Sequence, residues 1–112
     1  MSRSHLTIRV TDDVLFIVDV INRNDETGSA GISAYFSLTD MDADPNNLPY
    51  ELRTTYTTSV KVPSKNRADL DTAIEDVSEW MWAVPAAAAL ESYAMRVFRD
   101  TDHMMRFGNL ED

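Results

Sequence analysis

The stretch NRADLDTAIEDVSEWMWAVPAAAALESYAMRVFR, residues 66–99, is the segment of this chain with sustained helical periodicity. Apolar side chains in its first half recur every three or four residues, which places them on one side of an α-helix. They are Leu70, Ile74, Val77, Met81 and Val84. Ser64 or Asn66 can cap the first turn. Asp69 and Asp71 suit the positive end of the helix dipole. The pattern predicts a helix that begins near residue 66 and buries one apolar stripe.

Pro85 divides this segment. Because proline has no N–H to donate to the carbonyl of Met81 and its ring crowds that carbonyl, we expect the first helix to end or bend near residues 82–84. A second helix is expected to follow, with Pro85 in its first turn and the alanines at 86–89 as strong helix formers. Its inward face continues with Leu90, Ala94, Val97 and Phe98. The two helices are predicted to form one apolar layer over residues 66–99.

Four shorter segments have the features of β-strands. They are residues 5–10, 14–21, 32–38 and 52–62. The first and third alternate apolar and polar side chains, as does the fourth, which alternates most regularly until Pro63 stops it. The second is dense in β-branched and aromatic residues, and we interpret it as a more deeply buried strand. A helix capped by Thr11 or Asp12 is the alternative for that segment.

The remaining segments connect these elements. Residues 22–31 and 39–51 are rich in turn-forming residues and are predicted to be loops. The tail, residues 100–112, can continue the second helix or form a separate turn. We therefore predict an α+β fold, with about four antiparallel strands over residues 5–62 and two C-terminal helices over residues 66–99 packed on one face of the sheet. With 112 residues, the chain is expected to form a single domain.

The composition is that of an acidic, foldable chain. Hydrophobic residues make up 44% of it, and cysteine is absent, which excludes a disulfide framework, a thiolate metal site and a thiol nucleophile. The N-terminus lacks the apolar core of a signal peptide, and no apolar run approaches the ~20 residues that span a bilayer. We therefore expect a cytoplasmic protein with no membrane partner.

The net charge is −9, from 19 acidic and 10 basic residues. This sign disfavours direct binding to nucleic acid or an anionic membrane and favours basic partners. The charge is segregated, because residues 11–51 sum to −8, residues 52–67 to +4 and residues 68–95 to −6. Coding bias or adaptation to salt is an alternative cause of the acidity that involves no partner.

The predicted first helix carries an acidic face without compensating bases. Its carboxylates are Asp69, Asp71, Glu75, Asp76 and Glu79, and no Lys or Arg occurs between Arg67 and Arg96. Like charges four residues apart destabilise a helix by about 0.2–0.5 kcal/mol per pair, so helix stability alone would favour mixed signs. The face is either an ordinary solvated surface or a surface that meets a basic partner.

Two tryptophans adjoin that face. Trp80 and Trp82 are about 200° apart around a helix, so both cannot point into the same core. We expect at least one to be partly exposed, where it can anchor a partner within the acidic rim. The alternative is that core and interhelix packing absorb both. The predicted partner-binding residues are Asp69, Asp71, Glu75, Asp76, Glu79, Trp80 and Trp82.

The loop at residues 39–51 contains a motif that resembles the EF-hand calcium loop, D-x-D-x-D-G-x5-E. The matching carboxylates are Asp40, Asp42, Asp44 and Glu51. The resemblance implies calcium as their ligand. Pro45 stands where the EF-hand loop has glycine, and proline cannot adopt the positive φ of that sharp turn. The flanking segments are also predicted strands, so a solvated Asp/Asn/Pro turn is the alternative.

No motif indicates an enzyme. The sequence lacks G-x-S-x-G, a Gly-rich phosphate loop and H-E-x-x-H. Of the two histidines, His5 begins a predicted strand, and His103 lies near Asp100 and Asp102 without a nucleophile motif nearby. The basic residues around the fourth strand are Arg53, Lys61, Lys65 and Arg67. They are expected to pair with carboxylates rather than phosphates, because acidic regions flank them on both sides.

We therefore expect a small, non-catalytic interaction protein without a cofactor, which blocks a basic surface of a partner such as a nucleic-acid-binding protein. By analogy of size and charge, immunity proteins of nuclease toxins and phage anti-defence proteins act as nucleic-acid mimics in this way. The alternatives are a structural subunit of a homo-oligomer or virion, and a calcium-binding module built on the 40–51 loop.

Overall fold

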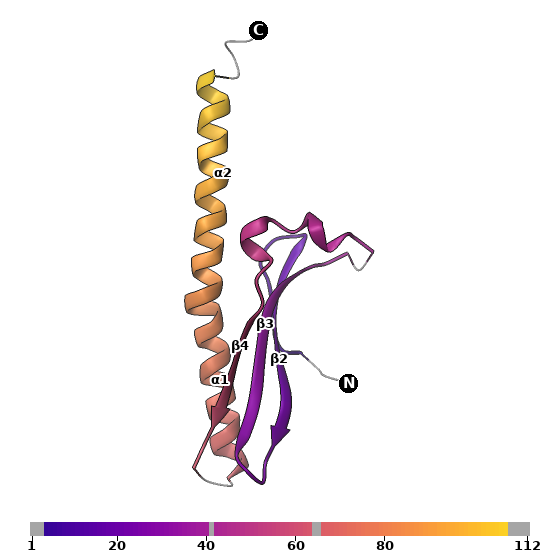
Figure 1. Ribbon diagram of the computed structural model, residues 1–112, viewed down its shortest axis with the longest axis vertical. Helices are drawn as coiled ribbons and strands as arrows, with labels where there is room; N and C mark the ends of the chain where they lie inside the picture. The colour runs from indigo at the N-terminus through magenta and orange to yellow at the C-terminus, as the bar shows by residue number, and fades with distance from the viewer. Residues whose placement is uncertain (1–3, 41, 64–65, 108–112) are drawn as a thin grey trace.

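The computed structural model describes residues 4–40, 42–63 and 66–107, and within these ranges the side chains of residues 5–101. A four-stranded antiparallel sheet is followed by one long helix that lies along one face of the sheet (Figure 1). The strands are β1 (Ser4–Arg9), β2 (Val14–Asn24), β3 (Ser29–Leu38) and β4 (Tyr56–Lys61), and their order in the sheet follows the chain. The predicted α+β class and the one-sided helical layer are confirmed.

The β2–β3 hairpin is longer than the sequence indicates. Residues 14–21 form a strand, so the alternative of a helix there was wrong. The predicted loop at 22–31 was too long, because Asn24 still pairs with Ser29. The side chain of Asn24 accepts hydrogen bonds from the N–H groups of the turn, and Gly28 closes the turn with a φ of 69°. Polar residues remain in strands here because backbone hydrogen bonds, which do not depend on the side chain, hold the ladder.

The last strand is shorter than predicted. Residues 45–47 and 50–52, expected as loop and strand start, form two short 3-10 helices, η1 (Pro45–Asn47) and η2 (Tyr50–Leu52). Leu52 is buried in the core from this turn. The guanidinium of Arg53 holds the turn by donating to the carbonyls of Leu48 and Asn46. Local alternation cannot reveal these side-chain bonds, which replace the strand ladder over residues 52–55.

The core lies between the helix and one sheet face. Burial alternates residue by residue along β2 and β3, as a strand with one covered face requires. The largest fully buried side chains are Phe16, Val18, Ile32, Leu70, Ile74, Ser78 and Met81. The buried hydroxyl of Ser78 donates to the carbonyl of Ile74 at 2.7 Å, so its polar group is satisfied within the helix.

The helix does not break at Pro85, and the prediction of two separate helices was wrong. α1 (Arg67–Met81) continues through a π-helical turn, η3 (Trp82–Ala86), into α2 (Ala87–Phe107). In this turn the N–H of Ala87 bonds the carbonyl of Trp82 five residues earlier, so the wider spacing accommodates the proline. The turn also shifts the phase of the helix. Val84, predicted on the buried stripe, is therefore 48% exposed.

The molecule is elongated because α2 extends beyond the sheet (Figure 1). Its principal extents are 68 × 28 × 17 Å, and the radius of gyration is 18.3 Å. A compact domain of this length would have a radius of gyration of about 13 Å. The outer half of α2 thus has no sheet to pack against.

Candidate interaction surfaces

The carboxylates predicted on the first helix are all exposed on α1, but they are not equivalent. Asp71 pairs with Arg23 at 2.6 Å. Arg23 also pairs with Asp25, and hydrogen bonds to these two carboxylates raise the pKa of its guanidinium. Within the described part of the chain, Glu75, Asp76 and Glu79 form no ion pair. We call these three carboxylates the acidic face of α1.

Arg23 reaches α1 because the strand β2 is irregular near its end. The register of the β2–β3 pairing shifts between Ile21 and Asn24, and Asn22 has a φ of 52°. Such an irregularity changes which face of the sheet the next side chain meets. The sequence signal for it is weak, since asparagine is one of the few residues that tolerates a positive φ.

The two tryptophans take different roles. Trp82 is partly buried, and its ring packs against that of Phe16 with centroids 5.4 Å apart. Trp80 is 52% exposed. The expectation that at least one tryptophan is exposed is confirmed, and the exposed one follows Glu79 directly on α1.

The 40–51 loop does not gather its four carboxylates. Asp40 and Asp44 each accept a hydrogen bond from a backbone N–H two residues ahead, and Asp44 thereby caps η1. Glu51 instead binds Arg96 of α2. In the described ranges no group of three or more His, Cys, Asp or Glu side chains could hold a metal ion. The physical reason is that Pro45 starts a 3-10 helix where a calcium loop would turn.

The pairing of Glu51 with Arg96 ties the loop to α2. The guanidinium of Arg96 lowers the pKa of the Glu51 carboxyl, chiefly through its side-chain hydrogen bonds. Arg96 also lies 5.5 Å from the ring centroid of Tyr93 and 3.6 Å from a carboxylate oxygen of Asp100. Arg96 is therefore fully engaged within its own chain.

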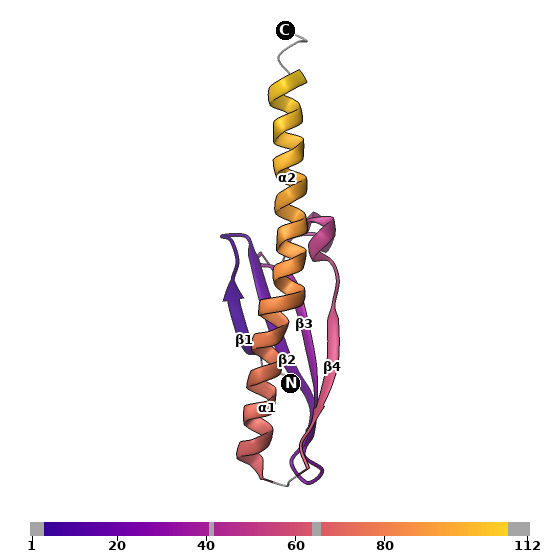
Figure 2. The same ribbon diagram turned by 90° about the vertical axis from the view of Figure 1, so that its left-hand side faces the viewer.

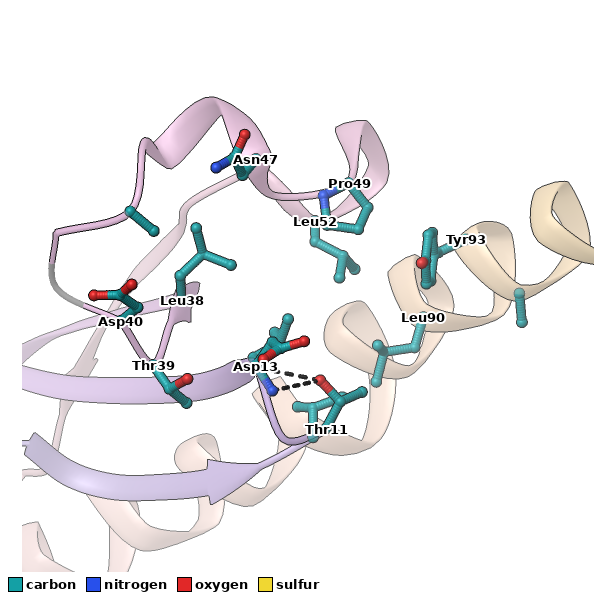
Figure 3. Close-up of a pocket in the computed structure, with 14 residues that line it drawn as sticks. Thr11, Asp13, Leu38, Thr39, Asp40, Asn47, Pro49, Leu52, Leu90 and Tyr93 are labelled. Atoms are coloured by element: carbon teal, nitrogen blue, oxygen red, sulfur yellow. Dashed lines mark hydrogen bonds between the residues drawn. The ribbon is translucent and has the colours of Figure 1, made fainter.

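A groove of about 610 Å³ lies between the β1–β2 turn, the 39–52 segment and α2 (Figure 3). Leu38, Leu52 and Leu90 line it together with polar groups such as Asp13 and the hydroxyl of Thr39. The hydroxyl of Thr11 is already used, because it accepts from the N–H groups of Asp13 and Val14. Sequence reasoning missed this groove because three segments distant in the chain form it.

The outer half of α2 exposes large apolar side chains. Met95 is 57% exposed, Val97 41% and Phe98 74%. The predicted inward face at Ala94, Val97 and Phe98 was wrong because the sheet ends before these residues, which are exposed in the described part of the chain. Arg99, one turn beyond Met95, is exposed and makes no ion pair with any described residue.

The other residues considered from sequence form no additional site in the described structure. His5 is exposed at the start of β1, and the side chains of Asp102 and His103 fall outside the described residues, as does Lys65. Arg53 is engaged with backbone carbonyls.

Comparison with known proteins gives no match to a protein-family model, a curated protein or a solved structure. Among the helices in the described part of the chain, none combines the length and apolar character needed to cross a membrane. Function must therefore be inferred from the surfaces themselves.

Proposed function

We propose that this protein is a small, non-catalytic interaction protein that binds and blocks a basic surface of a partner protein. The observation that carries the proposal is the acidic face of α1. There Glu75, Asp76 and Glu79 are exposed without an ion pair to any described residue, and the half-exposed Trp80 adjoins them. Inhibitors and antidotes of nucleic-acid-binding proteins, including immunity and anti-defence proteins, would use such a face.

The geometry of a helix suits this role. Glu75 and Glu79 are one turn apart, which is a rise of about 6 Å along the axis. Carboxylates repeated at this spacing on a rigid helix can occupy sites that Lys and Arg side chains prepare for phosphates. Because the carboxylates are exposed, the attraction is screened by salt within about 10 Å at 0.1 M ionic strength.

Trp80 supplies what charge alone does not. A tryptophan that enters a pocket on a partner contributes through buried area, and such residues dominate many interfaces. Trp82 cannot serve this purpose, because its ring is packed on Phe16. We therefore assign the anchor to Trp80 and a packing role to Trp82.

The test compares two triple variants that each remove three negative charges. The first is Glu75→Gln with Asp76→Asn and Glu79→Gln. The control is Asp12→Asn with Glu26→Gln and Asp42→Asn, which are also exposed. Binding to a fluorescent oligoarginine peptide, and to the partner recovered from the native host, is measured at low and high salt.

The first variant should lose at least about tenfold in affinity while the control retains most of it. Wild-type affinity should fall steeply as salt rises. Equal losses in the two variants would mean that binding depends on net charge alone and not on the acidic face of α1. An affinity that does not change with salt would contradict an electrostatic mechanism.

A second candidate is a subunit of a homo-oligomer or virion. It is supported by the exposure of Met95 and Phe98 on a helix that extends past the sheet. Sedimentation of the purified chain separates the candidates, because a large closed assembly favours the subunit and a monomer favours the inhibitor.

A further inference from the structure

We infer that the outer side of the long helix pairs with the same side of a second copy of this chain, in an antiparallel and symmetric dimer. The inference rests on the proposed function, because the dimer gives the acidic face of α1 a specific surface to meet. That surface is the outer half of α2 of another copy. The dimer thereby covers Trp80 and Glu79 of the proposed partner-binding site.

The outer side of the long helix carries exposed apolar side chains. Figure 2 looks onto the helix from the side away from the sheet, and no other element lies in front of it. Large apolar side chains exposed along it include Trp80 (52%), Val84 (48%), Met95 (57%) and Phe98 (74%). Steps of three and four residues connect Met95 and Phe98 with exposed Ala88 and Glu91, which keeps these four on one side of α2. Trp80 precedes the π-helical turn, and Val84 lies within it.

Charge sets the direction of pairing. Residues 68–95 contain six acids and no Lys or Arg, whereas residues 96–107 contain three Arg and two Asp. Two parallel copies would place acids against acids, and like-charge juxtaposition is costly. Antiparallel copies bring the acidic half of each helix against the end of the other that carries Arg99, which has no ion pair with a described residue of its own chain.

One register brings together two aromatic rings and two opposite charges. If the symmetry axis passes near Ala89, the residues that face each other have numbers that add to 178. Trp80 then meets Phe98 of the second copy, and Glu79 meets its Arg99. Each pair occurs twice, as a two-fold axis requires. Arg99 is available for this contact, because it has no ion pair with a described residue of its own chain.

The size of the contact sets its strength. The segment from residue 80 to residue 98 is about 27 Å long, with small exposed alanines at 87 and 88 in the middle that allow close approach. Stable interfaces bury roughly 800 Å² per partner, and a single pair of helices of this length lies near the lower limit. The dimer should therefore be reversible and dependent on concentration.

The consequence for function is competition. Trp80 and Glu79 cannot contact a second copy and a basic partner at once. The dimer is then a masked form, and a tighter basic partner converts it to a complex with the monomer.

Sedimentation velocity tests the dimer between about 1 µM and 1 mM, a range that covers weak interfaces. The mass should rise from the monomer value of 12.7 kDa toward twice that value. Phe98→Ser should raise the protein concentration at which the dimer forms by at least tenfold. Val97→Ser is the matched control, because Val97 is 41% exposed but lies off the side of α2 that carries Met95 and Phe98, and it should leave dimerisation unchanged.

The register is tested by exchange of charge. Glu79→Arg and Arg99→Glu should each weaken dimerisation at least tenfold, and the double variant should restore it. Wild type that stays monomeric to the highest concentration, an equal effect of the two serine variants, or a double variant that stays monomeric would each overturn the inference.

The oligoarginine peptide separates this inference from the proposed function. Peptide binding by a wild-type chain that never dimerises would leave the proposed function standing and remove the dimer. A dimer that forms as described, with no peptide binding by the Phe98→Ser monomer, would support the dimer and contradict the proposed function. Tighter peptide binding by Phe98→Ser than by concentrated wild type is the result expected if both hold.

Discussion

Arg96 donates two hydrogen bonds to the carboxylate of Glu51, which lies 45 residues earlier in the chain. The bonds join Nε to Oε2 at 2.5 Å and Nη2 to Oε1 at 3.0 Å. This bidentate pair links α2 to η2 at the point where the helix leaves the sheet.

Glu51→Gln should lower the midpoint of thermal unfolding at neutral pH, because it removes the charge that Arg96 binds. The folded-state pKa of Glu51 lies below its unfolded value, so the stabilisation is complete above the unfolded pKa. It is lost as pH falls through the lower, folded-state pKa. The difference between wild type and variant, followed by circular dichroism, should therefore shrink as pH falls below the unfolded pKa of Glu51 and through its lower folded-state pKa. Glu91→Gln is the control, and a difference that does not change with pH would contradict the assignment.

The two tryptophans should differ in stability. Trp82→Ala removes a ring packed on Phe16 and should lower the free energy of unfolding by about 3 kcal/mol. Trp80→Ala removes a half-exposed ring and should change it by less than about 0.5 kcal/mol when measured at low protein concentration. Urea unfolding gives both values. Comparable losses would mean that Trp80 is also structural.

Alkaline pH should destabilise the fold through two tyrosines. Burial raises the pKa of Tyr35, as does the hydrogen bond that its hydroxyl donates to Asp19 at 3.0 Å, and burial raises the pKa of Tyr56. A raised folded-state pKa means that stability is complete below the unfolded pKa and is lost as pH rises through the folded one.

Replacing both Tyr35 and Tyr56 with phenylalanine should flatten the loss of unfolding free energy as pH rises above the unfolded tyrosine pKa of about 10. Tyr50→Phe should not, since Tyr50 is 79% exposed. Identical pH profiles of the double variant and wild type would refute the role of these two hydroxyls.

The first turn of α1 depends on its cap. The side chain of Asn66 accepts a hydrogen bond from the N–H of Ala68 at 3.0 Å. Asn66→Ala should cost about 1 kcal/mol in the free energy of unfolding, whereas Asn66→Asp should cost little because aspartate caps equally well. Denaturant unfolding measures both, and an alanine variant as stable as the aspartate variant would exclude the cap.

Local patterns predicted most of the elements, and their failures have specific causes. The strands at 5–10 and 32–38 were predicted because a covered sheet face demands alternation, and the strand at 14–21 because it is dense in β-branched and aromatic residues. The continuity through Pro85 was not predicted, because proline ordinarily ends or bends a helix and the sequence does not reveal that a π-helical turn accommodates it. The last strand starts later than predicted because Arg53 forms hydrogen bonds with backbone carbonyls, which alternation of apolar and polar residues does not reveal.

Some features of the candidate site could also be predicted from the sequence, and others could not. The acidity of α1 and the presence of one exposed tryptophan follow from residue order and helical geometry alone. The choice of Trp80 as the exposed ring, the capture of Asp71 by Arg23 and the use of Glu51 by Arg96 required the fold. Each depends on which distant segment lies opposite.

By itself, the amino-acid order determined the class of fold and the acidic helix, because periodicity and charge are local properties of the chain. Only the tertiary structure decided that the helix is continuous and extends beyond the sheet, which covers the first half of the helix. The physical reason is that the length of a sheet is set by backbone pairing among four strands, whereas the length of a helix is set by its own residues. The mismatch between the two leaves Met95 and Phe98 uncovered.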